Sequence, residues 1–398
     1  MSTSADFALA YLAAGKLRVK RGAEAAIPIE SKFAQTVRER AASLHRRHGW
    51  KGQGRGARFM SGRMLWGATE TDPLEMRISI TGISPGASPG QLYYTLETPE
   101  ISGVFLVRDA GADELRLYHT ADFRLSEVAA HPQEGRLAFV LRNRAGGSSL
   151  AVMSADGTEF SEVTQGDAID AAPQWVPGAP STLVFQSAGV ARDQSGRYHG
   201  RGPFSLQKLD IGSGEMSCLG ESSEFDFLGP RISSDGTLYC IRRPYEPPHP
   251  KVNPFKLLLD VLLFPFRLVY AIFQYFNFFT MKYTGNPLVT AGNARQQNPD
   301  LREMMIWDNM VNADAARKAE PEDETPDLVP KSWELVRFTP GRIGNPEVLA
   351  RGVLSFDLAG DGSVLYSNGS AVFRLDGAGR SERLAKEPMI HSVVAARW

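Results

Sequence analysis

Two histidines near the N-terminus have the spacing of a metal-binding pair. His45 and His48 are three residues apart, so on a helix both imidazoles would lie on one side. A zinc site in a protein needs at least three protein ligands. Because no cysteine or carboxylate joins the pair at helical spacing, we predict no metal site there.

The other residue types that perform catalytic chemistry are dispersed along the chain. We expect no nucleophile turn of the Gly-x-Ser-x-Gly type, no phosphate-binding glycine loop and no paired-carboxylate motif. We therefore assign no catalytic, cofactor-binding or metal-ligating residue and expect a non-enzymatic protein without a cofactor. Because the loops of a ring fold can gather distant residues at one axial mouth, an enzyme or small-ligand site there stays open as an alternative.

The elements that must position any functional residue follow a repeat. Each copy is a turn rich in Gly, Pro, Ser or Asp, followed by a short β-prone strand. Asp-Gly and Pro-Gly suit a tight turn because glycine accepts positive φ. The five copies are Ser84–Tyr94, Pro132–Phe139, Val176–Phe185, Ser234–Tyr239 and Gly360–Tyr366.

The apolar residue that follows each turn sets the period of the repeat. It falls at Leu92, Leu137, Leu183, Leu238 and Val364, at intervals of 45, 46, 55 and 126 residues. A period near 45 residues is typical of four-stranded propeller blades. The last interval exceeds one period by about 80 residues, which predicts an insertion between the fourth and fifth copies.

The repeat resembles that of TolB-type propellers, whose blades carry a Trp-Ser-Pro-Asp-Gly-like turn between two strands. The best copies here are Pro173–Gly178, which reads PQWVPG, and Ser233–Gly236. The resemblance covers about residues 57–242 and 331–398 and implies an all-β propeller, but it says almost nothing about function. Relatives of this repeat in some peptidases cap a hydrolase domain, and no segment of this chain has the length of such a domain.

The number of copies and the end of the chain predict six blades. Five turns are visible, and Ile390–Ala396 reads as the first strand of a sixth blade, whose other strands we expect from Arg58–Ile80. Such an overlap closes the ring and removes open sheet edges. We therefore predict a six-bladed β-propeller closed by N- and C-terminal strands, formed by residues 57–242 and 331–398.

The insertion, residues 243–330, contains a very apolar segment. Phe255–Met281 has 20 apolar residues out of 27, nine of them aromatic, and we expect a helix there. Pro265 and three charged side chains interrupt this segment, and both features disfavour a simple transmembrane span. A single crossing would also place strands of one blade on opposite sides of a membrane.

The polar residues of this segment share one side of the expected helix. Such a helix can lie in a membrane interface or dip in and return at Pro265. A protein partner, a second copy of the chain and packing on the propeller remain alternatives. An acidic stretch from Lys318 to Pro330 reads as a flexible return linker. The residues expected to contact a membrane or a partner are Phe255, Leu258, Leu262, Phe266, Val269, Phe273, Phe276 and Phe279.

Residues 1–56 are expected to form a basic helical arm. Residues 1–60 carry twelve Lys/Arg against four Asp/Glu, although the net charge of the chain is −1. The arm is either a solvated helix beside the ring or a contact with anionic lipid. Nucleic acid is not favoured, because no aromatic platform or groove-reading motif supports it. The basic residues singled out are Arg38, Arg40, Arg46 and Arg47.

Three further features complete the sequence prediction. Cys218 and Cys240 read as two small buried side chains rather than a disulfide. The basic loop Ala191–Pro203 reads as a disordered connector or as a ligand or partner contact. The N-terminal residues lack the order of a secretory signal, which predicts a cytoplasmic protein.

The sequence thus predicts a cytoplasmic, membrane-associated propeller that serves as a scaffold for an unidentified protein partner, with homo-oligomerisation as an alternative.

Overall fold

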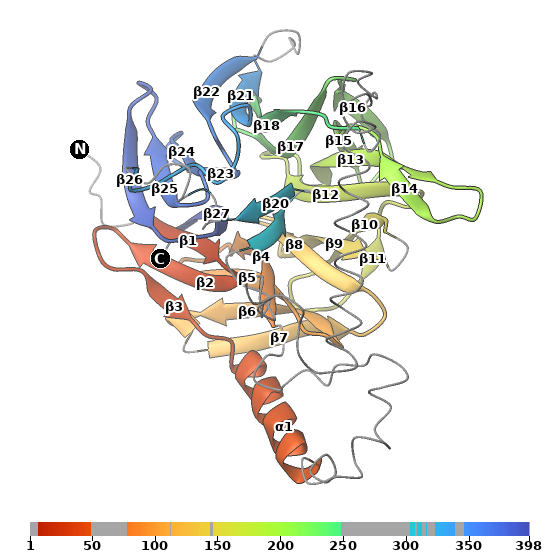
Figure 1. Cartoon of the computed structure of the whole chain (residues 1–398), viewed down its shortest axis with the longest axis vertical. Coiled ribbons are helices and arrows are strands. Elements are labelled where there is room, and N and C mark those ends of the chain that lie inside the picture. Colours follow the sequence, from red (N-terminus) through yellow and green to blue (C-terminus); the bar gives the residue numbers. More distant parts are fainter. Residues whose placement is uncertain are drawn as a thin grey trace, which may run out of the picture. The chain divides into compact units, whose positions relative to one another are not determined.

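In the computed structural model, the described residues form mainly antiparallel strands (Figure 1). Its contacts divide the chain into one unit of residues 1–245 and 302–398 and a second of residues 246–301. All helices and strands given below belong to the first unit. The residues described are 7–48, 78–111, 113–143, 146–247, 303–306, 309–312, 316, 323–338 and 346–397.

Groups of four neighbouring strands recur in this unit, and we name each group by its first strand. The β8 and β12 groups are joined into one sheet by a single parallel pair, Ser148–Ile169. The first three groups in chain order are the β4 group (β4 Ser79–Pro85, β5 Gln91–Glu97, β6 Ser102–Arg108, β7 Asp113–Thr120), the β8 group (β8 Arg124–Ala130, β9 Arg136–Arg142, β10 Ser148–Ser154, β11 Ser161–Glu162) and the β12 group (β12 Ala168–Trp175, β13 Thr182–Arg192, β15 Ser205–Asp210, β16 Met216–Gly220).

The remaining groups include one that joins the two ends of the chain. In that group the last strand of the chain, β27, pairs with the first, β1. These groups are the β17 group (β17 Phe225–Ile232, β18 Leu238–Pro244, β21 Glu334–Phe338, β22 Glu347–Arg351), the β23 group (β23 Ser355–Leu358, β24 Val364–Ser367, β25 Ala371–Leu375, β26 Ser381–Lys386) and the β27 group (β27 Ile390–Arg397, β1 Phe7–Ala13, β2 Lys16–Arg21, β3 Ile27–Ile29).

The first strands of the groups contact one another in a cycle. β4 contacts β8, β8 contacts β12, and β12 contacts β17. From there β17 contacts β23, β23 contacts β27, and β27 contacts β4. Figure 1 shows these strands toward the middle of the view, with the last strands of the groups further out.

The strands that complete the β27 group come from residues 7–29, which corrects two predictions. We expected these strands from Arg58–Ile80 and expected residues 1–56 to be a helical arm. Instead β1 is buried on both faces: Ala8, Ala10 and Leu12 join one core cluster, and Leu9, Tyr11 and Ala13 join another. The basic residues belong to β2, where they alternate with the buried Leu17 and Val19 in the period-two pattern of a strand.

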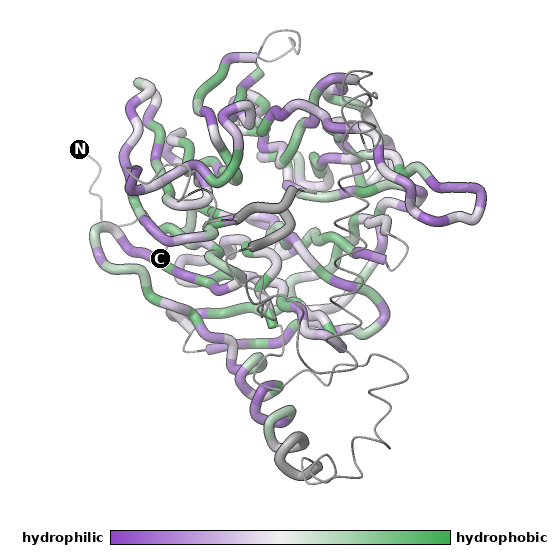
Figure 2. The backbone as a smooth tube through the Cα atoms, in the orientation of Figure 1, coloured by the Kyte–Doolittle hydropathy of each residue, from purple (hydrophilic) through white to green (hydrophobic). Residues whose placement is uncertain are grey.

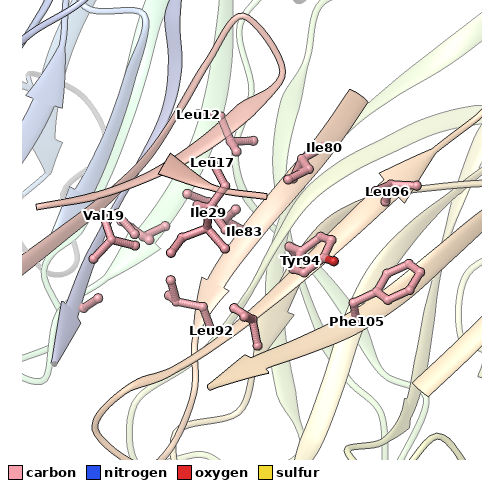
Figure 3. Close-up of a cluster of buried hydrophobic side chains, with 14 of the residues drawn as sticks. Leu12, Leu17, Val19, Ile29, Ile80, Ile83, Leu92, Tyr94, Leu96 and Phe105 are labelled. Carbon is pink, nitrogen blue, oxygen red and sulfur yellow. The ribbon is translucent and has the colours of Figure 1, made fainter. Parts of the chain in front are cut away.

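The helix α1 (Lys32–His48) is the part of the expected arm that is helical. It lies within the expected helical range, and it follows β3 directly. Its first turn joins the core that Figure 3 shows, because Ala34 is buried in that cluster and Phe33 packs against it. The same cluster contains Leu92, Tyr94 and Phe105 of the β4 group.

The turns of the sequence repeat connect the first and second strands of their groups. Leu92, Leu137, Leu183, Leu238 and Val364 therefore lie in β5, β9, β13, β18 and β24, and all five are buried. Glycine is required at several of these turns: Gly178, Gly236 and Gly362 have φ of 76°, 84° and 82°. The recurring apolar residue is thus the start of a second strand that is packed between two neighbouring groups.

Within the β17 group, β18 ends at Pro244 and its neighbour β21 begins at Glu334. The apolar segment Phe255–Met281 lies outside the described residues, whereas a short hairpin of β19 (Glu303–Ile306) and β20 (Asn309–Asn312) is described. The end of the expected flexible linker is packed instead. Leu328 N donates to Asn368 O at 2.9 Å, and Val329 is 5% exposed within a core cluster. Leu328 and Val329 follow the acidic residues, and their packing against a core cluster explains why this end of the expected linker is ordered.

Candidate functional site

The predicted contact residues are only partly within the described chain. The eight apolar residues from Phe255 to Phe279 lie outside it. Arg38 and Arg40 are exposed on α1, and Arg46 and Arg47 lie near the end of the same helix. In the part of the chain that the structure describes, no helix combines the length and the apolar character needed to cross a bilayer.

Among described residues, no cluster of three or more His, Cys, Asp or Glu side chains has the geometry to hold a metal ion. The stretch Gly86–Gly90 does have the Gly-x-Ser-x-Gly spacing that we did not expect. However, it forms the turn between β4 and β5, whereas a nucleophile turn joins a strand to a helix.

Three charged residues on first strands form the main polar feature inside the cycle. Arg231 Nε lies 3.3 Å from Asp357 Oδ1, and these side chains are 18% and 13% exposed. Burial raises the pKa of Asp357, while the Arg231 charge acts in the opposite direction. Burial also raises the pKa of Glu127, on β8. The charges of Arg142 and Arg231 act on this pKa in the opposite direction.

Backbone bulges position two of these charges. The strand register shifts between Ser126 and Ala129, and between Leu228 and Arg231. Glu127 lies in the first bulge with φ of 55°, a value that costs energy for a residue with a side chain. Arg231 directly follows the second bulge, in which Gly229 has φ of 60°. The bulges turn polar side chains out of an otherwise apolar strand pattern.

Polar contacts link every neighbouring pair of groups around the cycle, and we call this set the axial belt. Each contact joins a first strand, or the strand beside it, to the next group. The belt consists of Thr81 Oγ1 donating to Leu125 O (3.1 Å), Ala172 N to Glu127 Oε2 (2.6 Å), Gly229 N to Gln186 Oε1 (2.7 Å), Arg231 Nε to Asp357 Oδ1 (3.3 Å), Ala395 N to Asp357 Oδ2 (2.9 Å) and Ile80 N to Gly15 O (3.0 Å).

A second polar cluster, which we call the anchor, lies where the insertion leaves the β17 group. Asp226 is 1% exposed and accepts a bidentate pair of hydrogen bonds from Arg201 at 2.9 and 3.0 Å. Arg243 Nε donates to Asp226 Oδ2 at 2.9 Å, and Phe204 N donates to Asp226 Oδ1 at 2.8 Å. Burial alone would raise the pKa of Asp226, but these hydrogen bonds and charges hold it below its usual range.

The anchor holds both ends of the insertion. Tyr245, just after β18, donates from its hydroxyl to Arg201 O at 2.5 Å. Trp333, just before β21, is 4% exposed, and the Arg243 guanidinium lies 4.7 Å from its ring centre. The pairing of β18 with β21 brings the two ends together. The insertion therefore leaves and returns at one end of one strand pair.

The basic loop Ala191–Pro203 is not a disordered connector, which corrects the first of our two interpretations. β13 continues to Arg192 and pairs with β14 (Tyr198–Arg201) to form a hairpin that extends beyond the sheet (Figure 1). Its tip is hydrophilic (Figure 2). Asp193 closes the turn by accepting from Ser195 N and Arg197 N. A ligand or partner role for this hairpin stays a prediction.

A cavity of about 250 Å³ opens between the β4 and β8 groups. Its polar lining is a shared ion-pair network: Arg142 lies 2.6 Å from Glu97, and Arg124 lies 3.7 Å from the same carboxylate. Arg124 also donates to Thr98 O at 2.9 Å. These contacts fix the ends of the neighbouring strands, so the arginines already have partners.

The two cysteines differ from each other. Cys240 is buried as expected, and burial raises the pKa of its thiol. Cys218 is exposed, which corrects the prediction that both side chains are buried. It lies on β16, the outermost strand of its group, where one face meets solvent. Both thiols are free.

Sequence reasoning missed the three axial charges and the anchor. A signal for the axial residues was present, because Glu127 and Asp357 each interrupt an apolar strand, in LSEVAA and LSFDLA. An ionisable residue in the middle of such a strand needs a partner. No local pattern pointed to the anchor, whose three charges come from β14, β17 and β18.

Comparison with known proteins shows the fold alone. No protein-family model and no curated protein sequence matches the chain. The structure is similar to TolB from Acinetobacter baumannii, with 10% identity and a TM-score of 0.52 over 99% of this chain and 68% of that one. It is also similar to a chain from the crystal structure of a nidogen/laminin complex, with 7% identity and a TM-score of 0.51 over 97% of each chain. The chain therefore has a propeller-type β fold.

Proposed function

We propose that this chain is a six-bladed propeller scaffold held at a membrane by its apolar insertion. The six strand groups would be the blades, and the pairing of β27 with β1 would close the ring. Two observations support closure: the cyclic contacts of the first strands and the axial belt, which links all neighbouring groups. Closure leaves no open sheet edge between the first and last groups.

The anchor at the base of the insertion is the observation that best supports the membrane proposal. Asp226, Arg201 and Arg243 are nearly buried, and they hold the residues where the insertion starts and ends. Fixing both ends at one strand pair allows a segment to touch a membrane and return without the ring crossing it. The apolar sequence of Phe255–Met281, whose polar residues would share one side of a helix, is chemically suited to a membrane interface.

The scaffold itself would act by binding a protein partner rather than by catalysis. A rigid ring with loops at both ends of its strands offers separate surfaces for a membrane and a partner. The extended β13–β14 hairpin is one candidate for the partner surface, because it projects from its sheet and is stiffened by the Asp193 turn. No chemistry of the described residues identifies the partner.

Flotation of the purified protein with phosphatidylcholine vesicles tests the membrane proposal. The full chain is expected to float with the vesicles, and a variant lacking residues 253–283 is expected to remain in the dense fraction. A full-length variant with Leu258, Leu262 and Phe266 changed to glutamine should behave like the deletion. The matched control changes Lys256, Gln274 and Asn277 to serine and should float like the original.

Two results would reject this proposal. The first is a deletion variant that floats as well as the full chain. The second is a full chain that stays in the dense fraction and sediments as a defined oligomer, while the glutamine variant sediments as a monomer. The second result would assign the apolar segment to contact between copies of the chain, because the same substitutions would then abolish assembly.

A small-ligand site inside the ring is a second candidate function, favoured by the charges of Glu127, Arg231 and Asp357. Carboxylate and guanidinium groups facing one interior space suit a zwitterionic ligand. The probe is a set of free amino acids, and the expected result is a rise in the melting temperature that is lost in Arg231→Gln. No shift with any of these probes would reject an amino-acid site.

A further inference from the structure

The helix α1 is held firmly at its first turn. Ser31 Oγ accepts a hydrogen bond from Ala34 N at 3.1 Å, which is the contact of an N-cap residue. Glu114, from β7, accepts hydrogen bonds from Lys32 N at 2.8 Å and Phe33 N at 3.0 Å. A negative charge at a helix N-terminus also stabilises the helix dipole. The β4 group therefore fixes where α1 starts.

The apolar face of α1 leaves the core after this turn. The Phe33 ring centre lies 5.2 Å from that of Phe105, and Ala34 is 7% exposed. Val37 and Ala41 continue the same face but are partly exposed. Figure 1 shows α1 pointing away from the strands of the β4 group. The helix is thus a projecting element that is attached at one end.

The helix α1 is strongly basic. Lys32–His48 contains five Lys/Arg and one acidic residue, Glu39. Arg38 and Arg40 are exposed, and no ion pair between described residues involves either. Exposed arginines elsewhere have partners: Arg197 lies 3.6 Å from Asp193, and Arg380 lies 2.8 Å from Asp376. Arg38 and Arg40 therefore face solvent beside the partly exposed Val37 and Ala41.

We propose that α1 is a second, electrostatic membrane contact that recognises anionic lipid headgroups. This inference rests on the proposed membrane attachment of the insertion and adds the lipid chemistry to it. A basic helix with an apolar stripe binds anionic membrane surfaces through both features. Lipid is favoured over nucleic acid because Val37 and Ala41 offer apolar surface beside the cations, whereas α1 carries no aromatic residue beyond the docked Phe33 for base stacking.

The test compares flotation with phosphatidylcholine vesicles and with the same vesicles containing phosphatidylserine. The full chain is expected to bind the anionic vesicles more tightly, and each exposed arginine should contribute about fivefold. Arg38→Gln/Arg40→Gln should therefore lose about 25-fold in affinity for anionic vesicles. Its affinity for neutral vesicles should not change. Glu39→Gln, which removes the acidic residue, should strengthen anionic binding.

The charge-matched control is Arg197→Gln/Arg380→Gln, which removes two arginines that are 82% and 84% exposed. This variant should keep the preference for anionic vesicles. An equal loss in the control and the α1 variant would overturn the inference, since net charge rather than α1 would then explain the preference. An RNA oligonucleotide serves as the competing probe. Tight RNA binding that depends on Arg38 and Arg40, with no vesicle effect, would also overturn it.

This inference and the proposed function fail in different ways. If the full chain binds neutral and anionic vesicles equally through its insertion, the α1 inference is wrong and the insertion proposal stands. If the chain binds only anionic vesicles, and does so without residues 253–283, the insertion proposal is wrong and the α1 contact stands. Binding to neither kind of vesicle rejects both.

Discussion

The carboxylate of Asp226 is the charge on which the base of the insertion depends. It is 1% exposed and compensates Arg201 and Arg243, whose side chains are 9% and 4% exposed. Removing one member of a buried charged cluster leaves the others in a low-dielectric environment without a counter-ion, and this costs more than the loss of a surface pair. The anchor is therefore sensitive to a single substitution.

We predict that Asp226→Ala lowers the free energy of unfolding by about 3–5 kcal/mol. The measurement is urea denaturation at neutral pH. The control is Asp193→Ala, which removes a carboxylate that is 38% exposed in the nearby hairpin turn and should lower the free energy of unfolding much less. Equal losses in the two variants would mean that Asp226 does not anchor the insertion.

The pKa of Glu127 is shifted in the opposite direction to that of Asp226, so its contribution to stability depends on pH in the opposite way. Burial raises its pKa in the folded chain, so the folded state holds its proton more tightly than the unfolded state does. Stability from this group is therefore present below the ordinary glutamate pKa and is lost as pH rises through the raised value. Glu127→Gln keeps an acceptor for Ala172 N but carries no charge.

We expect Glu127→Gln to become more stable relative to the original chain as pH rises from about 4.5. Urea denaturation between pH 4 and pH 8 measures this difference, and Glu134→Gln, at a site 42% exposed, provides the baseline. A Glu127→Gln difference that is constant across this range would show that the carboxyl titrates alike in the folded and unfolded chains.

At the scale of elements, the strand β1 shows what the sequence pattern could and could not predict. The repeated turns placed β5, β9, β13, β18 and β24 correctly, because tight turns need local residue types that the sequence displays. β2, which pairs with β1, contains Lys16, Arg18, Lys20 and Arg21, and these charges obscured the alternation that buries Leu17 and Val19. Pairing between β1 and β27 joins residues at opposite ends of the chain, which no local pattern encodes.

A designed disulfide tests the register of this closing pair. Ala10 and Val394 are cross-strand partners in the same core cluster, so Ala10→Cys/Val394→Cys should form a disulfide and raise the melting temperature. In Ala10→Cys/Val393→Cys the second side chain lies on the other face, in a different cluster, and no disulfide should form. The number of free thiols and the melting temperature of each variant show which pair has formed a disulfide. A disulfide in the Ala10→Cys/Val393→Cys variant alone would contradict the register.

At the scale of the whole molecule, the described residues form groups of strands whose first strands contact one another in a cycle. The sequence predicted the recurring turn and the buried residue that follows it, because both leave marks in residue spacing. It could not predict the axial belt or the anchor. Their members, such as Glu127 and Ala172 or Arg201 and Asp226, meet only when different groups are packed together.

The most direct test of the membrane proposal places an environment-sensitive fluorophore in the insertion. Cys218, the exposed thiol, is first replaced by serine, while Cys240 is buried and its raised thiol pKa protects it from labelling. A label at Leu262→Cys should shift to shorter wavelength when phosphatidylcholine vesicles are added, and a label at Ser195→Cys, in the hydrophilic hairpin tip, should not. A label at residue 262 that gives the same spectrum with and without vesicles would contradict the account.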